Sequence, residues 1–171
     1  IVRRLREWVD TSKPRCEPVD VAVLLQDTAH LMAAEADDRD ASIEIDRANG
    51  PQRVDGDFVL LQQVLVNLVR NALQALERAG AAERTVRLRT GAGPEHLFIE
   101  VADAGDGIDD ERAGRLFEPF SSGRDDGLGV GLWLCRSLVE SHGGTLELAS
   151  RRDPTVFRIT LPVQAAAGNG S

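Results

Sequence analysis

A single long amphipathic segment constrains the fold of this chain more than any other feature. Asp57 suits a helix N-cap and Gly80 suits the position just after a helix ends. Between them, apolar residues recur at helical spacing, at positions 61, 64, 65, 68, 69, 72, 73 and 76. The pattern predicts a helix from Asp57 to about Glu77 with one face buried in a core.

The segments around this helix predict a mixture of helices and strands. With two further amphipathic patterns, helices are predicted at residues 20–36, 57–77 and 129–142. Alternating apolar residues and turn signals predict strands at residues 42–46, 52–54, 85–90, 97–101, 145–150 and 156–161. The last four are expected to form two hairpins, so the sequence predicts an α/β fold.

Length and composition exclude several classes of protein. A chain of 171 residues suits a single domain. The net charge of −8 repels a phosphate backbone, so nucleic acid is not an expected partner. No apolar run approaches the roughly 20 residues that span a bilayer. Cys16 and Cys135 are too few for a disulfide framework and suit a reducing cytoplasm.

Asn67 and Asn71 lie one turn apart on the same edge of the long predicted helix. Asparagine is about half a kcal/mol less favourable than alanine inside a helix, so the pair calls for an explanation. One explanation is that both residues are simply exposed on the helix surface, where asparagine is common. The other is a ligand role, because an amide oxygen suits Mg²⁺, which is otherwise held by water and substrate phosphates.

Asp103 ends an apolar strand-like run and begins the sequence DAGDG. Its carboxylate is expected to project into a sharp turn, where Gly105 and Gly107 allow positive φ and close approach of a flat ring. A buried carboxylate accepts from an exocyclic amine and opposes a carbonyl, which would select adenine over guanine. An ordinary turn is the alternative. A calcium loop is disfavoured, because Gly105 stands where an oxygen ligand is needed.

Three glycines, Gly127, Gly129 and Gly131, stand just ahead of the apolar residues of the third predicted helix. Backbone N–H groups at a helix N-terminus suit phosphate oxygens. A Rossmann fingerprint is excluded because the cluster follows a polar loop instead of a strand. A P-loop is excluded because the chain has no GK[ST].

In this order, the motifs resemble the ATP-binding catalytic domain of bacterial sensor histidine kinases, in the superfamily that also contains gyrase, a heat-shock chaperone and a mismatch-repair ATPase. The matching sequences are LVNLVRNA, DAGDG, FEPF and GLGVGL followed by VESHGG. The resemblance implies a Bergerat-type ATP-binding fold, a two-layer α/β sandwich with a mixed β-sheet and helices on one face. It also implies ATP as the nucleotide and Mg²⁺ as the metal.

The resemblance also implies roles for individual residues. Asn71 would hold the metal, Asn67 would line the phosphate pocket, and Asp103 would bind the adenine amine. Relatives that hydrolyse ATP carry Glu where Asn67 stands, and an amide cannot act as a general base, so slow hydrolysis is expected. The further expected nucleotide contacts are Gly105, Gly107, Ile108, Phe117, Phe120, Ser122, Arg124, Gly127, Leu128, Gly129, Val130, Gly131 and Leu132.

The sequence LFEPFSSGRDDG resembles the lid of these kinases. Phe117 and Phe120 would anchor its base by burying aromatic surface. Arg124 stands where the family has a lysine that contacts the terminal phosphate, and Ser122 with Gly123 replaces a threonine pair. Arginine is a good phosphate donor, so Arg124 is expected to act in catalysis together with the two asparagines.

The resemblance divides the chain into four parts. These are the tail of a dimerisation helix at 1–13, a linker at 14–20, the ATP-binding domain at 21–163 and a disordered tail at 164–171. A plain amphipathic helix is the alternative for residues 1–13. None of His30, His96 and His142 is followed by the acidic, arginine-bearing run of a phosphoaccepting histidine. The acceptor is therefore expected upstream of Ile1, on the dimerisation domain of a homodimeric parent protein.

The implied function is transfer of the ATP γ-phosphate to that histidine and then to a response regulator receiver domain. A cytoplasmic location is expected, and the sequence leaves open whether the parent protein is anchored in a membrane. Two alternatives remain. One is a non-catalytic nucleotide-binding module, suggested by the altered lid at Gly123. The other is an anti-sigma-type serine kinase or an ATPase of the same fold, which Asn67 disfavours.

Overall fold

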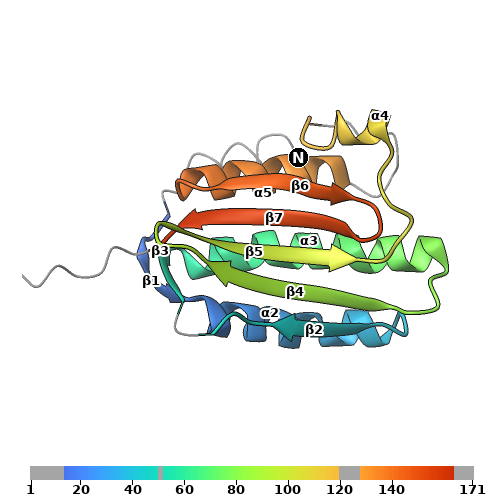
Figure 1. Ribbon diagram of the computed structural model, residues 1–171, viewed down its shortest axis with the longest axis horizontal. Coiled ribbons are helices and arrows are strands. Elements are labelled where there is room, and N and C mark those ends of the chain that lie inside the picture. The colour runs from blue at the N-terminus through green and yellow to red at the C-terminus, as the bar shows by residue number, and fades with distance from the viewer. Residues whose placement is uncertain (1–13, 50–51, 120–127, 164–171) are drawn as a thin grey trace, which may run out of the picture.

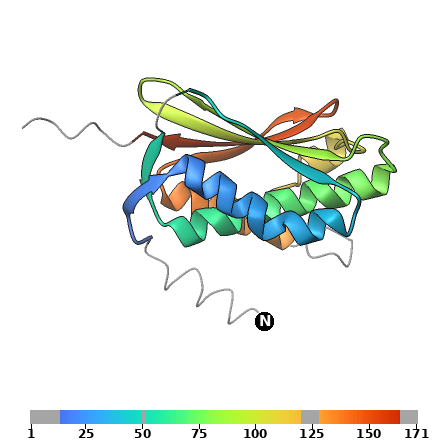
Figure 2. The ribbon, with the colours of Figure 1, turned by 90° about the horizontal axis from the view of Figure 1, so that it is seen from below.

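The computed structural model describes residues 14–49, 52–119 and 128–163, which form two layers (Figures 1 and 2). One layer is a five-stranded sheet, and the other is a set of helices packed on one of its faces. The predicted helix at 1–13 and the predicted tail at 164–171 lie outside the described residues. So do four predicted site residues, Phe120, Ser122, Arg124 and Gly127.

The sheet is mixed, as the sequence predicted. Its strands, in spatial order, are β2 (Ser42–Asp46), β4 (Thr85–Ala92), β5 (His96–Asp103), β7 (Thr155–Pro162) and β6 (Thr145–Arg151). β2 and β4 are parallel, and every other neighbouring pair is antiparallel. Both predicted hairpins, β4–β5 and β6–β7, are confirmed.

Three long helices cover one face of this sheet: α2 (Val21–Asp37), α3 (Phe58–Ala79) and α5 (Leu128–Ser141) (Figure 2). α3 contacts both α2 and α5, so it is the middle helix of the layer. The short helix α4 (Asp110–Ala113) follows β5 at one end of the sheet (Figure 1). Within the described segments, no helix combines the length and the apolar character that a membrane crossing needs.

The predicted boundaries of α3 are confirmed by its caps. The Asp57 carboxylate accepts a hydrogen bond from the Leu60 N–H at 3.2 Å. Gly80 ends the helix with φ of +59°, a left-handed conformation that glycine adopts without strain. Between the caps, nine apolar side chains of α3 are buried, including Leu65, Leu73 and Leu76. α3 therefore forms the centre of the core.

A small second sheet precedes α2. β1 (Glu17–Asp20) pairs antiparallel with β3 (Arg53–Gly56). The linker predicted at 14–20 therefore contains a strand that the sequence did not indicate, because four residues with Pro18 among them give no alternating pattern. The strand predicted at 52–54 is observed as β3.

The uncovered face of the large sheet carries a row of alternating charges. The row crosses all five strands in register, as Asp46, Arg89, Glu100, Arg158 and Glu147. Arg158 is bonded to carboxylates on both sides, at 3.4 Å to Glu100 and 3.8 Å to Glu147. Cross-strand pairs of opposite charge stabilise a sheet and suit a face that meets water, so this face needs no second helix layer.

The position of α3 in the core predicts unequal effects of two truncations on this helix. Leu65 is 0 % exposed and Val59 is 61 % exposed. Leu65→Ala should lower the free energy of unfolding by about 2–5 kcal/mol, because it removes buried apolar surface and leaves a cavity. Val59→Ala should change it by no more than about 0.5 kcal/mol. Urea unfolding of both variants measures this, and equal losses would contradict the burial of α3.

Candidate functional site

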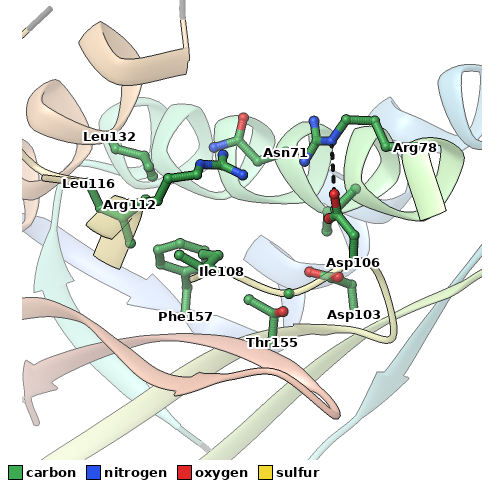
Figure 3. Close-up of a pocket in the computed structure, with 13 residues that line it drawn as sticks. Asn71, Arg78, Asp103, Asp106, Ile108, Arg112, Leu116, Leu132, Thr155 and Phe157 are labelled. Carbon is green, nitrogen blue, oxygen red and sulfur yellow. Dashed lines mark hydrogen bonds and ion pairs between the residues drawn. The ribbon is translucent and has the colours of Figure 1, made fainter. Parts of the chain in front are cut away.

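A pocket lies between α3, the loop that follows β5, and β7 (Figure 3). Five predicted site residues line it: Asn71, Asp103, Gly107, Ile108 and Leu132. The structure therefore brings the helix asparagine and the strand-end aspartate into one cavity, although 32 positions separate them in the chain.

Asp103 is the last residue of β5, and its carboxylate is almost fully enclosed, with 5 % of the residue exposed. Burial raises the pKa of this carboxyl to about 6. The Gly105 N–H, which donates to its Oδ1 at 2.9 Å, opposes that rise, the nearby charge of Asp106 adds to it, and Arg78 weakly opposes it. The Asp103 carboxylate is therefore a hydrogen-bond acceptor that is largely shielded from water at one end of the pocket.

Two glycines hold the loop after β5 against α3. A Cβ on Gly105 would stand 2.9 Å from the Cβ of Ala75 on α3 and 2.6 Å from Oδ1 of Asp103, so no larger residue fits. Gly107 has φ of +75°, which side chains rarely adopt. The glycines predicted to turn the chain beside Asp103 therefore also set the distance between the loop and α3.

Arg78 and Asp106 form an ion pair at the Asp103 end of the pocket (Figure 3). The Arg78 Nε lies 3.5 Å from the Asp106 Oδ2, and both side chains are partly exposed. Because the pair joins α3 to the loop after β5, it spans the two elements that form this end.

Apolar side chains form the middle of the pocket wall. They are Ile108, Leu116, Leu132 and Phe157. Phe117, predicted to anchor a lid, is not on this wall. Its ring packs edge-on against Phe157, with centroids 6.5 Å apart, and the Arg136 guanidinium lies 4.7 Å from its centroid. Phe117 therefore supports the wall through Phe157.

Asn67 lies outside this pocket. Its Nδ2 donates to the Cys135 Sγ at 3.5 Å, and a Cβ on Gly131 would lie 3.5 Å from the same Nδ2. Burial raises the pKa of the Cys135 thiol to about 11. Among the described residues, Asn67 and Gly131 thus meet where α3 packs on α5. Leu128, Gly129 and Val130 form the first turn of α5.

Several residues of the pocket wall were not predicted from the sequence: Arg78, Asp106, Arg112, Leu116, Thr155 and Phe157. Arg78 had a visible signal, because it follows Asn71 by seven residues, which places both on one face of a helix. Thr155 had none. It reaches the site because β7 pairs with β5 in the register that sets Thr155 opposite Asp103.

The described residues contain no cluster of three His, Cys, Asp or Glu side chains able to hold a metal ion. Asn71 lines the pocket, and its side chain carries one amide oxygen. A single neutral ligand fits Mg²⁺, which keeps several waters and is commonly held by substrate phosphates. The donor set therefore suits a metal that arrives with a phosphorylated ligand.

The fold and the pocket together define a class. The two-layer α/β sandwich contains a pocket with the buried Asp103 carboxylate at one end, apolar walls, and the amide of Asn71 on α3. An acceptor at one end and apolar walls beside it can bind a flat ring that carries a hydrogen-bond donor.

Comparison with known proteins gives the family. The family model described as histidine kinase-, DNA gyrase B- and HSP90-like ATPase matches residues 56–165. The chain is 38 % identical over 170 residues to the C4-dicarboxylate transport sensor protein DctS of Rhodobacter capsulatus, covering 95 % of this chain and 25 % of DctS. It is 35 % identical over 163 residues to the sensor protein FixL of Bradyrhizobium diazoefficiens, covering 95 % of this chain and 32 % of FixL.

A solved structure agrees. Full-length ShkA in complex with AMPPNP superposes with a TM-score of 0.77 at 26 % identity, covering 91 % of this chain and 32 % of that one. The chain belongs to the histidine kinase-, DNA gyrase B- and HSP90-like ATPase family, as an ATP-binding domain of the sensor-kinase type. The predicted fold and family are confirmed. The chain spans about a quarter to a third of the length of these relatives.

The environment of Asp103 predicts how the variant Asp103→Asn behaves. The folded-state pKa of about 6 lies above the unfolded value, so the ionised carboxylate destabilises the fold as pH rises through 6. Asparagine has no such charge. The stability of D103N relative to wild type should therefore be greater at pH 8 than at pH 4.5, by about 1–2 kcal/mol.

Chemical denaturation of both proteins at the two pH values measures this difference. Asp55→Asn is a suitable control, because Asp55 is exposed on β3 and lies off the pocket wall. A D103N advantage that is the same at both pH values would contradict the buried, under-solvated carboxylate.

Proposed function

We propose that this chain is the ATP-binding part of a sensor histidine kinase, and that the pocket holds ATP with its adenine at Asp103 and its phosphates toward Asn71. One observation carries the proposal: these two side chains, from β5 and α3, line the same pocket.

The chemistry at the Asp103 end of the pocket, called the base end below, favours adenine as the base of the bound nucleotide. With a pKa of about 6, the Asp103 carboxyl is mostly ionised at neutral pH and is a strong acceptor. The exocyclic amine of adenine would donate to it, whereas the carbonyl of guanine would place two acceptors face to face. Ile108 and Phe157 offer apolar surface to the flat ring.

The chemistry at the Asn71 end of the pocket favours a metal-bound triphosphate. Asn71 would give its amide oxygen to Mg²⁺, which when bound neutralises part of the phosphate charge. The backbone N–H groups near Gly127, Gly129 and Gly131, at the start of α5, would donate to phosphate oxygens. Phe120, Ser122 and Arg124 remain predicted lid contacts, and Arg124 would reach the terminal phosphate.

The pocket chemistry favours transfer to another group over hydrolysis. Both acidic side chains on its described wall, Asp103 and Asp106, lie at the base end. Asn67 has an amide where a hydrolase needs a carboxylate, and it cannot take a proton from water. The nucleophile would therefore come from outside the domain.

We propose that this nucleophile is a histidine on the dimerisation domain of the parent protein. His142 is unsuitable, because both of its ring nitrogens are engaged. Its Nε2 accepts from the Asp57 N–H at 3.0 Å, and its Nδ1 lies 2.7 Å from the Leu138 carbonyl oxygen. Catalysis would consist of positioning and charge neutralisation, and the phosphoryl group would then pass to an aspartate of a receiver domain.

The setting of the parent protein follows from the same proposal. Cys16 and Cys135 are both free thiols, which suits a reducing cytoplasm, where ATP is plentiful. A dimerisation domain would make the parent a homodimer, with residues 1–13 as the tail of its helix and residues 14–20 as the connection to this domain.

A phosphotransfer assay tests the proposal. The chain is mixed with a dimerisation domain supplied in trans, γ-labelled ATP and Mg²⁺, and label on histidine is measured. Wild type should label the histidine, and Asn71→Ala should lower the rate by about 100-fold or more, a loss typical of removing one electrostatic contact to the reacting group. Gln62→Ala, on the same helix but off the pocket wall, serves as the matched control and should match wild type.

Two results would contradict the proposal. Tight ATP binding with no transfer would indicate a non-catalytic nucleotide-binding module. Rapid release of phosphate without any acceptor would indicate an ATPase.

A further inference from the structure

We propose that Arg112 is a nucleotide-binding residue, whose guanidinium binds the phosphate chain at the end of the pocket away from Asp103. The proposal rests on the function proposed above and adds to it a cation that none of the sequence motifs indicates.

The Arg112 side chain is placed to reach a ligand in the pocket. This residue belongs to α4, is half-buried, and lines the pocket. Figure 3 shows its side chain extending into the pocket toward Asn71, with the guanidinium far from the Asp103 carboxylate. Leu116 and Leu132 lie on the same side of the cavity. Arg112 therefore faces the region between Asn71 and the start of α5, where the phosphates are proposed to lie.

The charged side chains of the pocket are distributed unevenly between its two ends. Among the described residues, two arginines line the pocket, and they differ in their partners. Arg78 is paired with Asp106 at 3.5 Å, so its charge is largely neutralised at the base end. Arg112 makes no ion pair with any carboxylate of the described residues. The base end thus keeps the negative charge of Asp103 beside a neutralised ion pair, whereas Arg112 leaves an uncompensated positive charge at the other end. This distribution matches an amine-bearing ring joined to a polyanion.

Contacts within the protein fix the backbone of Arg112. The Asp109 carboxylate accepts from the Arg112 N–H at 2.8 Å and so caps α4. The Ile108 N–H donates to the Arg151 carbonyl at 2.8 Å, and the Arg151 side chain forms an ion pair with Asp110. The last two contacts tie the start of α4 to the end of β6. Ligand binding therefore needs little further ordering of the backbone that carries Arg112.

The chemistry of arginine indicates which part of the ligand it serves. A guanidinium presents its donors in a planar fork that fits two phosphate oxygens at once, and it stays charged at every physiological pH. Arg112 should therefore contribute to the affinity for ATP and ADP and contribute almost nothing for adenosine, which has no phosphate.

Equilibrium binding of the 171-residue chain to ATP, ADP and adenosine, each with Mg²⁺, tests this inference. Arg112→Ala should weaken ATP binding by about 10-fold or more, as expected for losing a charge-assisted contact, and change adenosine binding by less than about 2-fold. Arg112→Lys should fall between Arg112→Ala and wild type, because an ammonium keeps the charge but lacks the fork.

Arg115→Ala is the matched control, because Arg115 is exposed, lies three residues farther along and is off the pocket wall. It should bind all three ligands as wild type does. Thermal unfolding of each variant reports whether the fold is intact, and Arg112→Lys keeps the test valid if Arg112→Ala is destabilised.

Three results would overturn the inference alone. They are equal ATP affinities for Arg112→Ala and Arg115→Ala, equal losses for ATP and adenosine, and tighter ATP binding by Arg112→Ala, which would mean that Arg112 blocks the pocket. A wild-type chain that binds no ATP would instead overturn the proposed function, and the inference with it.

Discussion

The contact between the loop after β5 and helix α3 is the constraint on which the site depends. Gly105 packs so closely on Ala75 that a Cβ there would stand 2.9 Å from the alanine methyl. That approach is possible because α3 is fixed by its buried apolar face, packed on the sheet and between α2 and α5. It encloses the Asp103 carboxylate and brings it into the pocket that Asn71 lines. The buried charge lowers stability at neutral pH, a cost that proteins commonly carry where a polar group must meet a ligand.

Much of the fold follows from local sequence patterns. The apolar period between Asp57 and Gly80 sets α3, since its caps and its buried face are properties of one segment. The two hairpins follow from alternation on either side of short turns. β1 and α4 were not predicted, because each has only four residues and carries no period that a pattern can detect. Local patterns also leave the order of the strands open, because pairing between distant segments depends on tertiary packing.

The site was only partly predictable, for the same physical reason. Asn71 and Asp103 stand in recognisable motifs, and the structure places both on one pocket wall. Asn67 belongs to the same motif as Asn71, yet its side chain meets Cys135 on α5, because a four-residue step along the helix does not decide which neighbour each side chain meets. Thr155 and Arg112 reach the pocket through strand register and the capping of a one-turn helix, which long-range contacts determine.

A crystal structure of this chain with Mg²⁺ and a non-hydrolysable ATP analogue tests the central claim most directly. The account predicts that the adenine amine lies within hydrogen-bonding distance of the Asp103 carboxylate, while the metal-bound phosphates lie at the Asn71 end of the same pocket. A nucleotide bound outside this pocket, or one with its phosphates at Asp103 and its base toward Asn71, would contradict the account.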